Sequence, residues 1–283
     1  MEPDSSGRYC LEQVRRLDHE RFLAALFAPA ERRPALFALY AFNIELARIR
    51  VLVSEAMLGE IRLQWWRETI EALYAGTTPA HDLGPALRAA IDAHDLPQGA
   101  LIDLIDARGL ELAEAPPADW AAFEDYADRT SGAVMRLAAQ VLAGPLTASA
   151  QDPVRRAGLA YGLTGLLRSL PLDAAHGRYL LPLALLEKHG LDPHDLFAGR
   201  MKPGLAGLLA DTVARARDHL AAARAARAAV PRRAYPALLP VSLIERPLAL
   251  LSRPGFDPFR DSADVPGYRQ QVRLLVQAGR GRF

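Results

Sequence analysis

The sequence predicts an all-α fold. Apolar residues recur at spacings of three and four along almost the whole chain, and no segment shows the alternation of a β-strand. The 283 residues are 51% hydrophobic and 24% charged, a composition that suits one large globular core. No internal repeat or linker marks a domain boundary, so we expect 1–283 to form a single domain of about ten helices packed as in a bundle.

Helix breakers and capping residues divide the first half of the chain into six helical segments. Pro29 ends the first segment, and Ser54 is placed to cap the third, which Gly76 ends. Asp119 follows a pair of prolines and is placed to cap the sixth segment. The expected helices span 8–28, 31–53, 55–75, 85–94, 98–114 and 119–143.

The second half follows the same rules. Asp152 and Pro153 form an N-cap and first-turn pair that opens a helix, and Pro171 is expected to end it early. A loop is expected over 255–266, and the Gly-Arg-Gly-Arg-Phe end should fray. The expected helices span 153–170, 183–189, 204–229, 236–251 and 267–278, with a short helical turn at 193–198.

Composition excludes several classes of function. A net charge of +1 argues against a nucleic-acid partner. A single cysteine, Cys10, excludes an intrachain disulfide and a four-cysteine zinc site, and it suits a reducing compartment. The first residues resemble neither a signal nor a transit peptide, and no run of apolar residues is long enough to span a bilayer. We therefore expect a cytoplasmic protein, with peripheral contact at the inner membrane left open.

The helix expected over 204–229 is unusually basic. This helix could present an ordinary solvated face, or a surface for anionic lipid or an acidic partner. Its arginines are Arg215, Arg217, Arg224 and Arg227, with Arg232 and Arg233 just after.

Two segments resemble the metal-binding helices of the squalene/phytoene synthase family. Residues 36–52 read LFALYAFNIELARIRVL, and residues 158–182 read GLAYGLTGLLRSLPLDAAHGRYLLP. Further similarity at 62–67 (RLQWWR) and 126–132 (YADRTSG) extends the match over a core of about 9–251, followed by the helix at 267–278. The resemblance implies an isoprenoid-synthase-type bundle.

The family's enzymes join two prenyl diphosphates head to head. An Asp-rich motif on each of two facing helices holds Mg²⁺ against the diphosphates. The resemblance places a central cavity between the helices near 31–53, 119–143, 153–170 and 204–229.

In the first motif the family's aspartate positions fall on Ala47, Arg48 and Val51. None of these side chains can ligate Mg²⁺, a hard cation that prefers oxygen. Arg48 borders an apolar stripe that includes Tyr40. There it either extends its charge to water, or faces the cavity and pairs with a carboxylate or an external anion.

In the second motif the family's Asn and first Asp positions fall on Gly165 and Ser169, and only Asp173 remains. A single carboxylate cannot hold the several Mg²⁺ ions that two diphosphates need. Arg168 and Arg178 match family arginines, which either bind phosphate or a partner's carboxylate, or tie the following loop to the domain.

The sequence therefore predicts no metal site and no catalytic residue. The candidate residues for a cavity or anion site are Arg48, Arg168, Asp173, Arg178, Tyr40, Tyr126 and Tyr161.

Within the family, the chain is most similar to a divergent branch, the mitochondrial complex I assembly factors. The AFNIELA string at 41–47 is specific, because it replaces the enzyme motif with a definite alternative. Other matching strings are YCLE (9–12), VSE (53–55), LPLALLEKHGLDPHDLF (181–197) and AYPALLPVSL (234–243).

This branch implies a non-catalytic binding or assembly protein linked to respiratory complex I biogenesis. Its partner would be a complex I subunit or assembly protein, and it would need no cofactor. One alternative is an active head-to-head prenyltransferase that uses Mg²⁺ with farnesyl or geranylgeranyl diphosphate. Another is a carrier that retains the cavity for an isoprenoid or quinone ligand.

Overall fold

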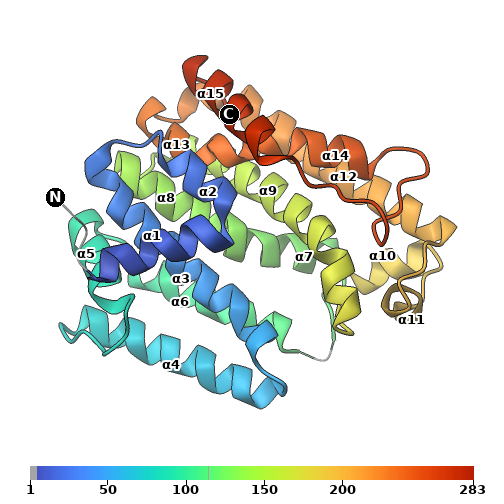
Figure 1. Cartoon of the computed structure of the whole chain (residues 1–283), viewed down its shortest axis with the longest axis horizontal. Coiled ribbons are helices and arrows are strands. Elements are labelled where there is room, and N and C mark those ends of the chain that lie inside the picture. Colours follow the sequence, from blue (N-terminus) through green and yellow to red (C-terminus); the bar gives the residue numbers. More distant parts are fainter. Residues whose placement is uncertain (1–4, 114) are drawn as a thin grey trace.

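A computed structural model describes residues 5–113 and 115–283, and all regular secondary structure in these ranges is helical. The predicted all-α fold is confirmed. Helix α9 crosses the centre of the view in Figure 1, with α4 at the lower edge and α15 at the upper edge. Helices α8 and α12 pack directly against α9. The molecule is thus built around one long central helix.

The helices in chain order are α1 (Ser5–Leu17), α2 (His19–Ala25), η1 (Ala30–Arg32), α3 (Arg33–Leu52), α4 (Ala56–Tyr74), α5 (Gly84–His94), α6 (Gln98–Ala107), η2 (Arg108–Glu111), α7 (Trp120–Ala127), η3 (Asp128–Gly132), α8 (Ala133–Ala143), α9 (Ala148–Ala175), α10 (Leu183–Lys188), α11 (Pro193–Phe197), α12 (Pro203–Ala225), η4 (Arg227–Ala229), η5 (Arg232–Ala234), α13 (Tyr235–Leu238), η6 (Leu239–Leu243), α14 (Glu245–Leu251) and α15 (Gly267–Gly279). The element η3 is a π-helical turn, and the other η elements are 3₁₀ turns.

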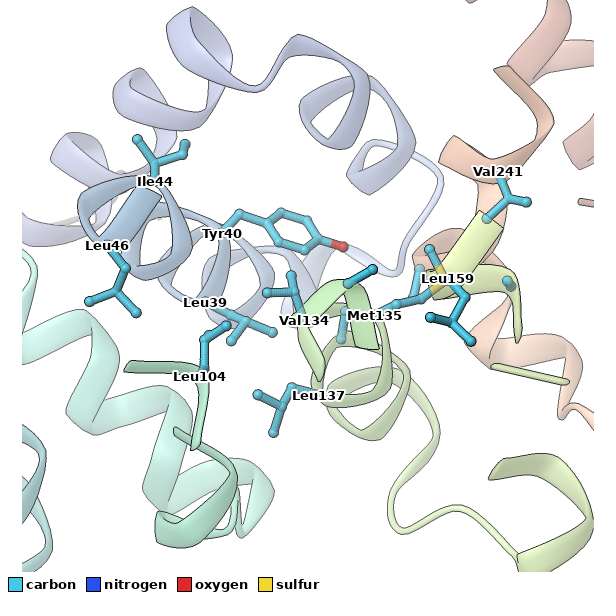
Figure 2. Close-up of a cluster of buried hydrophobic side chains, with 14 of the residues drawn as sticks. Leu39, Tyr40, Ile44, Leu46, Leu104, Val134, Met135, Leu137, Leu159 and Val241 are labelled. Atoms are coloured by element: carbon cyan, nitrogen blue, oxygen red, sulfur yellow. The ribbon is translucent and has the colours of Figure 1, made fainter. Parts of the chain in front are cut away.

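The core between α3, α8 and α9 is filled with large apolar side chains. Tyr40 of α3 points toward Met135 of α8 and Leu159 of α9 (Figure 2). All three side chains are buried. Full burial of an apolar side chain of this size contributes about 1.5–3 kcal/mol. The stability of the bundle therefore rests on this packing, and the same side chains occupy much of the interior.

Helix α9 and the turn η3 approach so closely that their backbones touch. A Cβ atom added to Gly158 would lie 2.5 Å from the Cα atom of Gly132. On the same turn, the Thr130 hydroxyl donates to the carbonyl oxygen of Tyr126 at 2.6 Å. Only glycine permits this approach, which places Tyr126 and α9 at a defined separation.

Two features predicted near the start of the chain, an unbroken first helix and a cap at Ser54, are wrong. The helix expected over 8–28 is broken at Asp18, whose carboxylate accepts from the backbone N–H of Arg21 at 3.2 Å and from its guanidinium at 2.6 Å. Asp18 thereby caps a separate helix, α2. Helix α4 begins after Glu55 and has no side-chain cap, so Ser54 does not have the predicted role.

Helix α9 is longer at both ends than predicted. It begins after Thr147 and continues to Ala175, with Pro153 and Pro171 inside it. A proline removes one backbone hydrogen bond, but packing of the apolar face provides most of a helix's stability in a folded protein. Leu170 and Ala174 are buried on either side of Pro171, and this burial keeps the helix continuous.

The C-terminal region also differs from the prediction. The helix expected over 236–251 is divided into α13, η6 and α14, with Pro240 at the start of the central 3₁₀ turn. The chain end is packed rather than frayed. Phe283 is 2% exposed, its ring lies edge-on to Tyr235, and its carbonyl oxygen accepts from Arg224 Nε at 2.9 Å.

One described segment, Arg232–Leu251, has the length and apolar character of a membrane span, although none was expected. Within this segment, 72% of the most apolar stretch is buried inside the protein. Its residues pack against α2, α8 and α9. Packing in the core therefore accounts for its apolar sequence.

The arginines of α12 are all used for internal contacts, whereas Arg227 of the expected helix lies in the turn η4. Arg215 pairs with Glu124 of α7, and Arg217 bonds the carbonyl oxygen of Leu248 and the hydroxyl of Ser252. Arg224 reaches Glu245 and the chain end. This part of α12 therefore ties neighbouring helices together, which leaves little free charge for a lipid surface.

Substitution of Gly158 with alanine should destabilise the protein by about 1–3 kcal/mol, because the added methyl group meets backbone atoms that cannot move aside. Gly165→Ala is the matched control on the same helix. Its new Cβ meets nothing within 4 Å, so a better helix former should leave stability unchanged or raise it by up to about 1 kcal/mol. Urea unfolding midpoints measure both effects, and equal midpoints would contradict the close approach.

The contact between α7 and α12 should depend on pH. Burial raises the pKa of Glu124, but hydrogen bonds from His219 and Arg215 outweigh that effect and lower the pKa to about 2 from an ordinary 4.5. A lowered carboxyl pKa stabilises the fold above the unfolded value, and this contribution disappears as the pH falls from about 4.5 toward 2.

Glu124→Gln should therefore destabilise the protein by about 2 kcal/mol at pH 7, with the difference from wild type shrinking below pH 4.5. Asp125→Asn is the control, because Asp125 forms only an exposed 3.7 Å ion pair with Arg129. It should change stability by less than about 0.5 kcal/mol. Unfolding measured across this pH range tests both variants, and a constant Glu124→Gln difference would contradict the proposed ionisation.

Candidate functional site

A pocket of about 480 Å³ opens where α3 and α9 end. Helices α3 and α9 contribute to its wall as predicted, whereas α8 and α12 do not. Apolar side chains fill the space between α3, α8 and α9 (Figure 2). The remaining wall therefore comes from the segment after α6, the loop after α9 and Phe197 of α11. The lining residues are Ala47, Arg50, Val51, Leu110, Glu111, Ala113, Ala115, Pro116, Asp173, Gly177, Arg178, Tyr179, Leu180 and Phe197.

Local helix geometry explains which side chains reach the pocket. Ala47, Arg50 and Val51 are three and four positions apart on α3, so they share one face of its last turns. The helix then ends at Leu52, and Val53 adopts an extended conformation. On the facing side, the continuation of α9 past Pro171 carries Asp173 to the pocket. Had α9 ended at Pro171, no helix would hold this carboxylate in place.

Two guanidinium groups lie at the pocket. Arg178 donates from Nη1 to the carbonyl oxygen of Arg50 at 3.1 Å. The Nε atom of Arg50 is buried and has no hydrogen-bond partner among the described residues. Burial, followed by the charge of Arg178, lowers the pKa of Arg50. An anionic group bound here would accept a hydrogen bond from Arg50 Nε, and it would offset the repulsion between the positive charges of Arg50 and Arg178.

Two carboxylates accompany the guanidinium groups. Burial raises the pKa of Asp173, although the Ser169 hydroxyl donates to it at 2.7 Å and the charge of Arg178 opposes the rise. Asp173 is thus a poorly solvated carboxylate held by a neighbour on the preceding helical turn. Glu111 is the second carboxylate, and its charge increases the cost of ionising Asp173.

Glu111 is held by a buried hydrogen-bond network. Its Oε1 atom accepts from Arg108 at 2.6 Å and from the Tyr126 hydroxyl at 2.5 Å. Arg108 also donates to the side-chain oxygen of Asn43 at 2.8 Å. Burial raises the pKa of Tyr126 well above its ordinary value, so Tyr126 remains a neutral hydrogen-bond donor. Glu111 is therefore positioned by the protein rather than free to bind a ligand.

Among the residues that the structure describes, the charges at and next to the pocket leave a positive excess. Arg50, Arg108 and Arg178 carry three positive charges, against two negative charges on Glu111 and Asp173. Within the ranges 5–113 and 115–283, no group of three or more His, Cys, Asp or Glu side chains is arranged to hold a metal ion. Chemically, the arrangement suits recognition of one anionic group by a pair of guanidinium groups.

The structure brings together only part of the predicted site. Ala47, Val51, Asp173 and Arg178 line the pocket. Two more candidates reach it through a neighbour: Ser169 bonds Asp173, and Tyr126 bonds Glu111.

Three residues of the site were not predicted from the sequence: Arg50, Arg108 and Glu111. Arg50 could have been found, because it lies one helical turn after Ala47. Arg108 and Glu111 carried no such signal, since they were assigned to the end of the helix at 98–114. In the structure α6 stops at Ala107, and the turn η2 directs Glu111 to the pocket.

Arg168 belongs to a separate network that ties α9 to two other parts of the chain. Its guanidinium pairs with Glu20 of α2 and with Asp264 of the loop before α15, each at 2.9 Å. Tyr161 donates to the other oxygen of Glu20 at 2.9 Å. These contacts give Arg168 a structural role, but they join α9 to α2 and to the loop before α15 rather than tying the loop that follows α9 to the domain.

Tyr40 also belongs to this region rather than to the pocket. The guanidinium of Arg21 lies 5.7 Å from the ring centroid of Tyr40 and 4.9 Å from that of Tyr161. Arg21 is buried and paired with Asp18. These contacts join α2 to α3 and α9 through cation–π attraction.

Arg48 and Gly165 face neither network. Arg48 is half-buried and forms no hydrogen bond or ion pair with any residue in the described ranges, and it does not line the pocket. Its placement fits a guanidinium that reaches solvent at the border of α3. Gly165 is exposed, with open space around it.

A family model described as squalene/phytoene synthase matches residues 14–275. The chain is 30% identical over 278 residues to "NADH dehydrogenase (ubiquinone) complex I, assembly factor 6" of Bos taurus and of Homo sapiens, covering 98% of this chain and 83% of each relative. It is also 30% identical over 221 residues to a phytoene synthase of Thermus thermophilus, covering 77% of this chain and 72% of that enzyme.

Solved structures show the same fold. A dehydrosqualene synthase with bound ligand superposes with a TM-score of 0.82 at 19% identity, covering 97% of this chain and 95% of that one. The squalene synthase HpnC from Alicyclobacillus acidocaldarius gives a TM-score of 0.72 at 20% identity, covering 98% and 95%. These matches confirm the resemblance carried by the segments 36–52 and 158–182: the chain belongs to the squalene/phytoene synthase family.

Proposed function

We propose that this protein is a non-catalytic binding and assembly protein that supports the biogenesis of respiratory complex I. The observation that carries the proposal is the pair Arg50 and Arg178 at the pocket formed by the two altered helices. The relatives named as complex I assembly factor 6 support the same reading, because their similarity covers 98% of the chain. The protein would act in the cytoplasm or at the cytoplasmic face of the inner membrane.

The pocket would bind an anionic group, a phosphate or a carboxylate, on a ligand or on a complex I subunit or assembly protein. Arg50 supplies a buried Nε–H that has no partner in the described ranges, and Arg178 supplies a second guanidinium beside it. A pair of forked donors suits either anion. No cofactor is part of this proposal.

An active prenyltransferase is the second candidate, favoured by the phytoene synthase relative and by the two carboxylates at the pocket. Two features weigh against it. Glu111 is already bonded to Arg108 and Tyr126, and Arg50 would repel a divalent cation at the same place. Mg²⁺ would enter only with this alternative.

Purified protein should release no diphosphate from farnesyl or geranylgeranyl diphosphate in the presence of Mg²⁺, because too few free oxygens converge to hold the ions. Diphosphate release and extracted hydrocarbon products would be measured side by side. A dehydrosqualene synthase serves as the positive control. Turnover to a head-to-head product would establish the second candidate instead.

Arg50→Ala and Arg178→Ala should each weaken anion binding about 10- to 100-fold, the effect of losing one charge-assisted contact. In a deletion strain of a host that contains complex I, either variant should leave assembled complex I close to the deletion level. Native gels and NADH oxidation by isolated membranes provide the measurement.

Arg48→Ala is the matched control for these variants, since it removes an arginine from the same turns of α3 but outside the pocket. It should cost less than about 1 kcal/mol of stability and complement fully. Denaturant midpoints of all three variants separate misfolding from loss of binding. Full complementation by stable Arg50→Ala and Arg178→Ala variants would refute the role of the pocket.

A further inference from the structure

The last helix, α15, exposes apolar side chains to solvent and turns glutamines toward the protein. Gln270 and Gln277 are buried. The exposed apolar side chains are Tyr268 (63%), Val272 (58%), Leu275 (62%) and Val276 (40%). Their spacing of four, seven and eight residues from Tyr268 places them on one stripe. A helix that only completes a soluble core shows the opposite orientation.

This orientation is held in place by definite contacts. Leu274, on the inner face, is fully buried in a cluster with Leu239 and Leu243 of η6 and Leu23 of α2. Gln270 donates to the carbonyl oxygen of Val265 at 3.0 Å. Helix α15 lies at the upper edge of the molecule in Figure 1, so its outer face has no neighbouring helix in that direction. The apolar stripe is a formed surface of the fold.

The stripe lies in a basic environment without matching acids. Residues 265–283 contain four arginines and no aspartate or glutamate. The nearby Glu245 is already neutralised by Arg224 and Arg273. Exposed arginines at both ends of α15 form no ion pair with any residue that the structure describes: Arg246, Arg269, Arg280 and Arg282. Arg246 and Arg269 line a hollow at the N-terminal end of α15, and Arg280 and Arg282 lie at its C-terminal end.

We propose that α15 is an interfacial helix that binds an anionic lipid bilayer. Its apolar stripe enters the boundary between headgroups and acyl chains, and the arginines at both ends contact lipid phosphates. The unpaired arginines lie at the two ends of a helix roughly 20 Å long. A single acidic side chain could not contact both ends, whereas the phosphate layer of an anionic bilayer could.

A second exposed apolar surface, on α4, does not fit a bilayer in the same way. There Met57, Ile61 and Trp65 lie among both acidic and basic side chains, including Glu60 and Glu68. Helices α4 and α15 lie at opposite edges of the molecule (Figure 1), so binding through α15 leaves α4 directed away from the membrane. The α4 surface is therefore a matched control. This proposal rests on α15 alone and does not depend on the proposed function.

The test is sedimentation of the full chain with vesicles of phosphatidylcholine alone, or with about one third phosphatidylglycerol. The wild type should bind the anionic vesicles at least about tenfold more tightly, and added salt should weaken this binding. The double variant Val272→Gln, Leu275→Gln should lose most binding, since the apolar stripe is removed. Arg280→Gln with Arg282→Gln should reduce both the affinity and its salt dependence.

The control Met57→Gln with Ile61→Gln should bind vesicles like the wild type. All substituted residues are exposed, and unfolding midpoints would verify that each variant folds. If only the α4 variant lost vesicle binding, the membrane contact would lie on α4 and the proposal for α15 would be wrong. Equal binding to both vesicle types, or a wild-type dimer that the α15 variant converts to a monomer without vesicle binding, would overturn the proposal.

Discussion

The close packing of α9 is the constraint on which the rest of this structure depends. Gly158 lies against Gly132 of the π-helical turn, and apolar residues on both sides of Pro171 are buried. Together these contacts keep α9 helical to Ala175. The fixed separation of α9 from the turn positions Tyr126, and the uninterrupted C-terminal end positions Asp173. Tyr126 holds Glu111 by a hydrogen bond, and Asp173 is the second carboxylate of the pocket.

The pocket combines guanidinium and carboxylate groups at the ends of two helices. Helix α3 contributes Ala47, Arg50 and Val51 on one side, and helix α9 contributes Asp173 on the other. A buried guanidinium needs a counter-charge, whereas a carboxylate cluster needs cations. Glu111 already accepts hydrogen bonds from Arg108 and Tyr126, so the protein itself satisfies this carboxylate. The balance that remains favours an anionic ligand.

Charged residues elsewhere in the chain are used mainly to join helices. Arg168 connects α9 to α2 and to the loop before α15, and Arg215 connects α12 to α7. The exposed arginines at the ends of α15 form no ion pair with any described residue, so their charges remain available to a partner. This surface and the pocket at the ends of α3 and α9 have no lining residue in common.

The sequence by itself determined the all-α fold and the family, because helical periodicity and local motifs depend on residues close together in the chain. Most helix ends were also predictable, since caps such as Asp119 act locally.

Tertiary structure decided the rest. Burial of neighbouring residues keeps α9 helical past Pro171, and a 3₁₀ turn places Glu111 at the same pocket as Asp173. Arg168 pairs with Glu20 and Asp264, which are distant in the chain, and so it does not line the pocket. Arg48 and Arg50 lie on one helix and look equivalent in sequence. Only the packing of α3 against its neighbours places Arg50 in the pocket and leaves Arg48 at the border. These outcomes depend on the free energy of contacts between residues far apart in the chain, which no local pattern records.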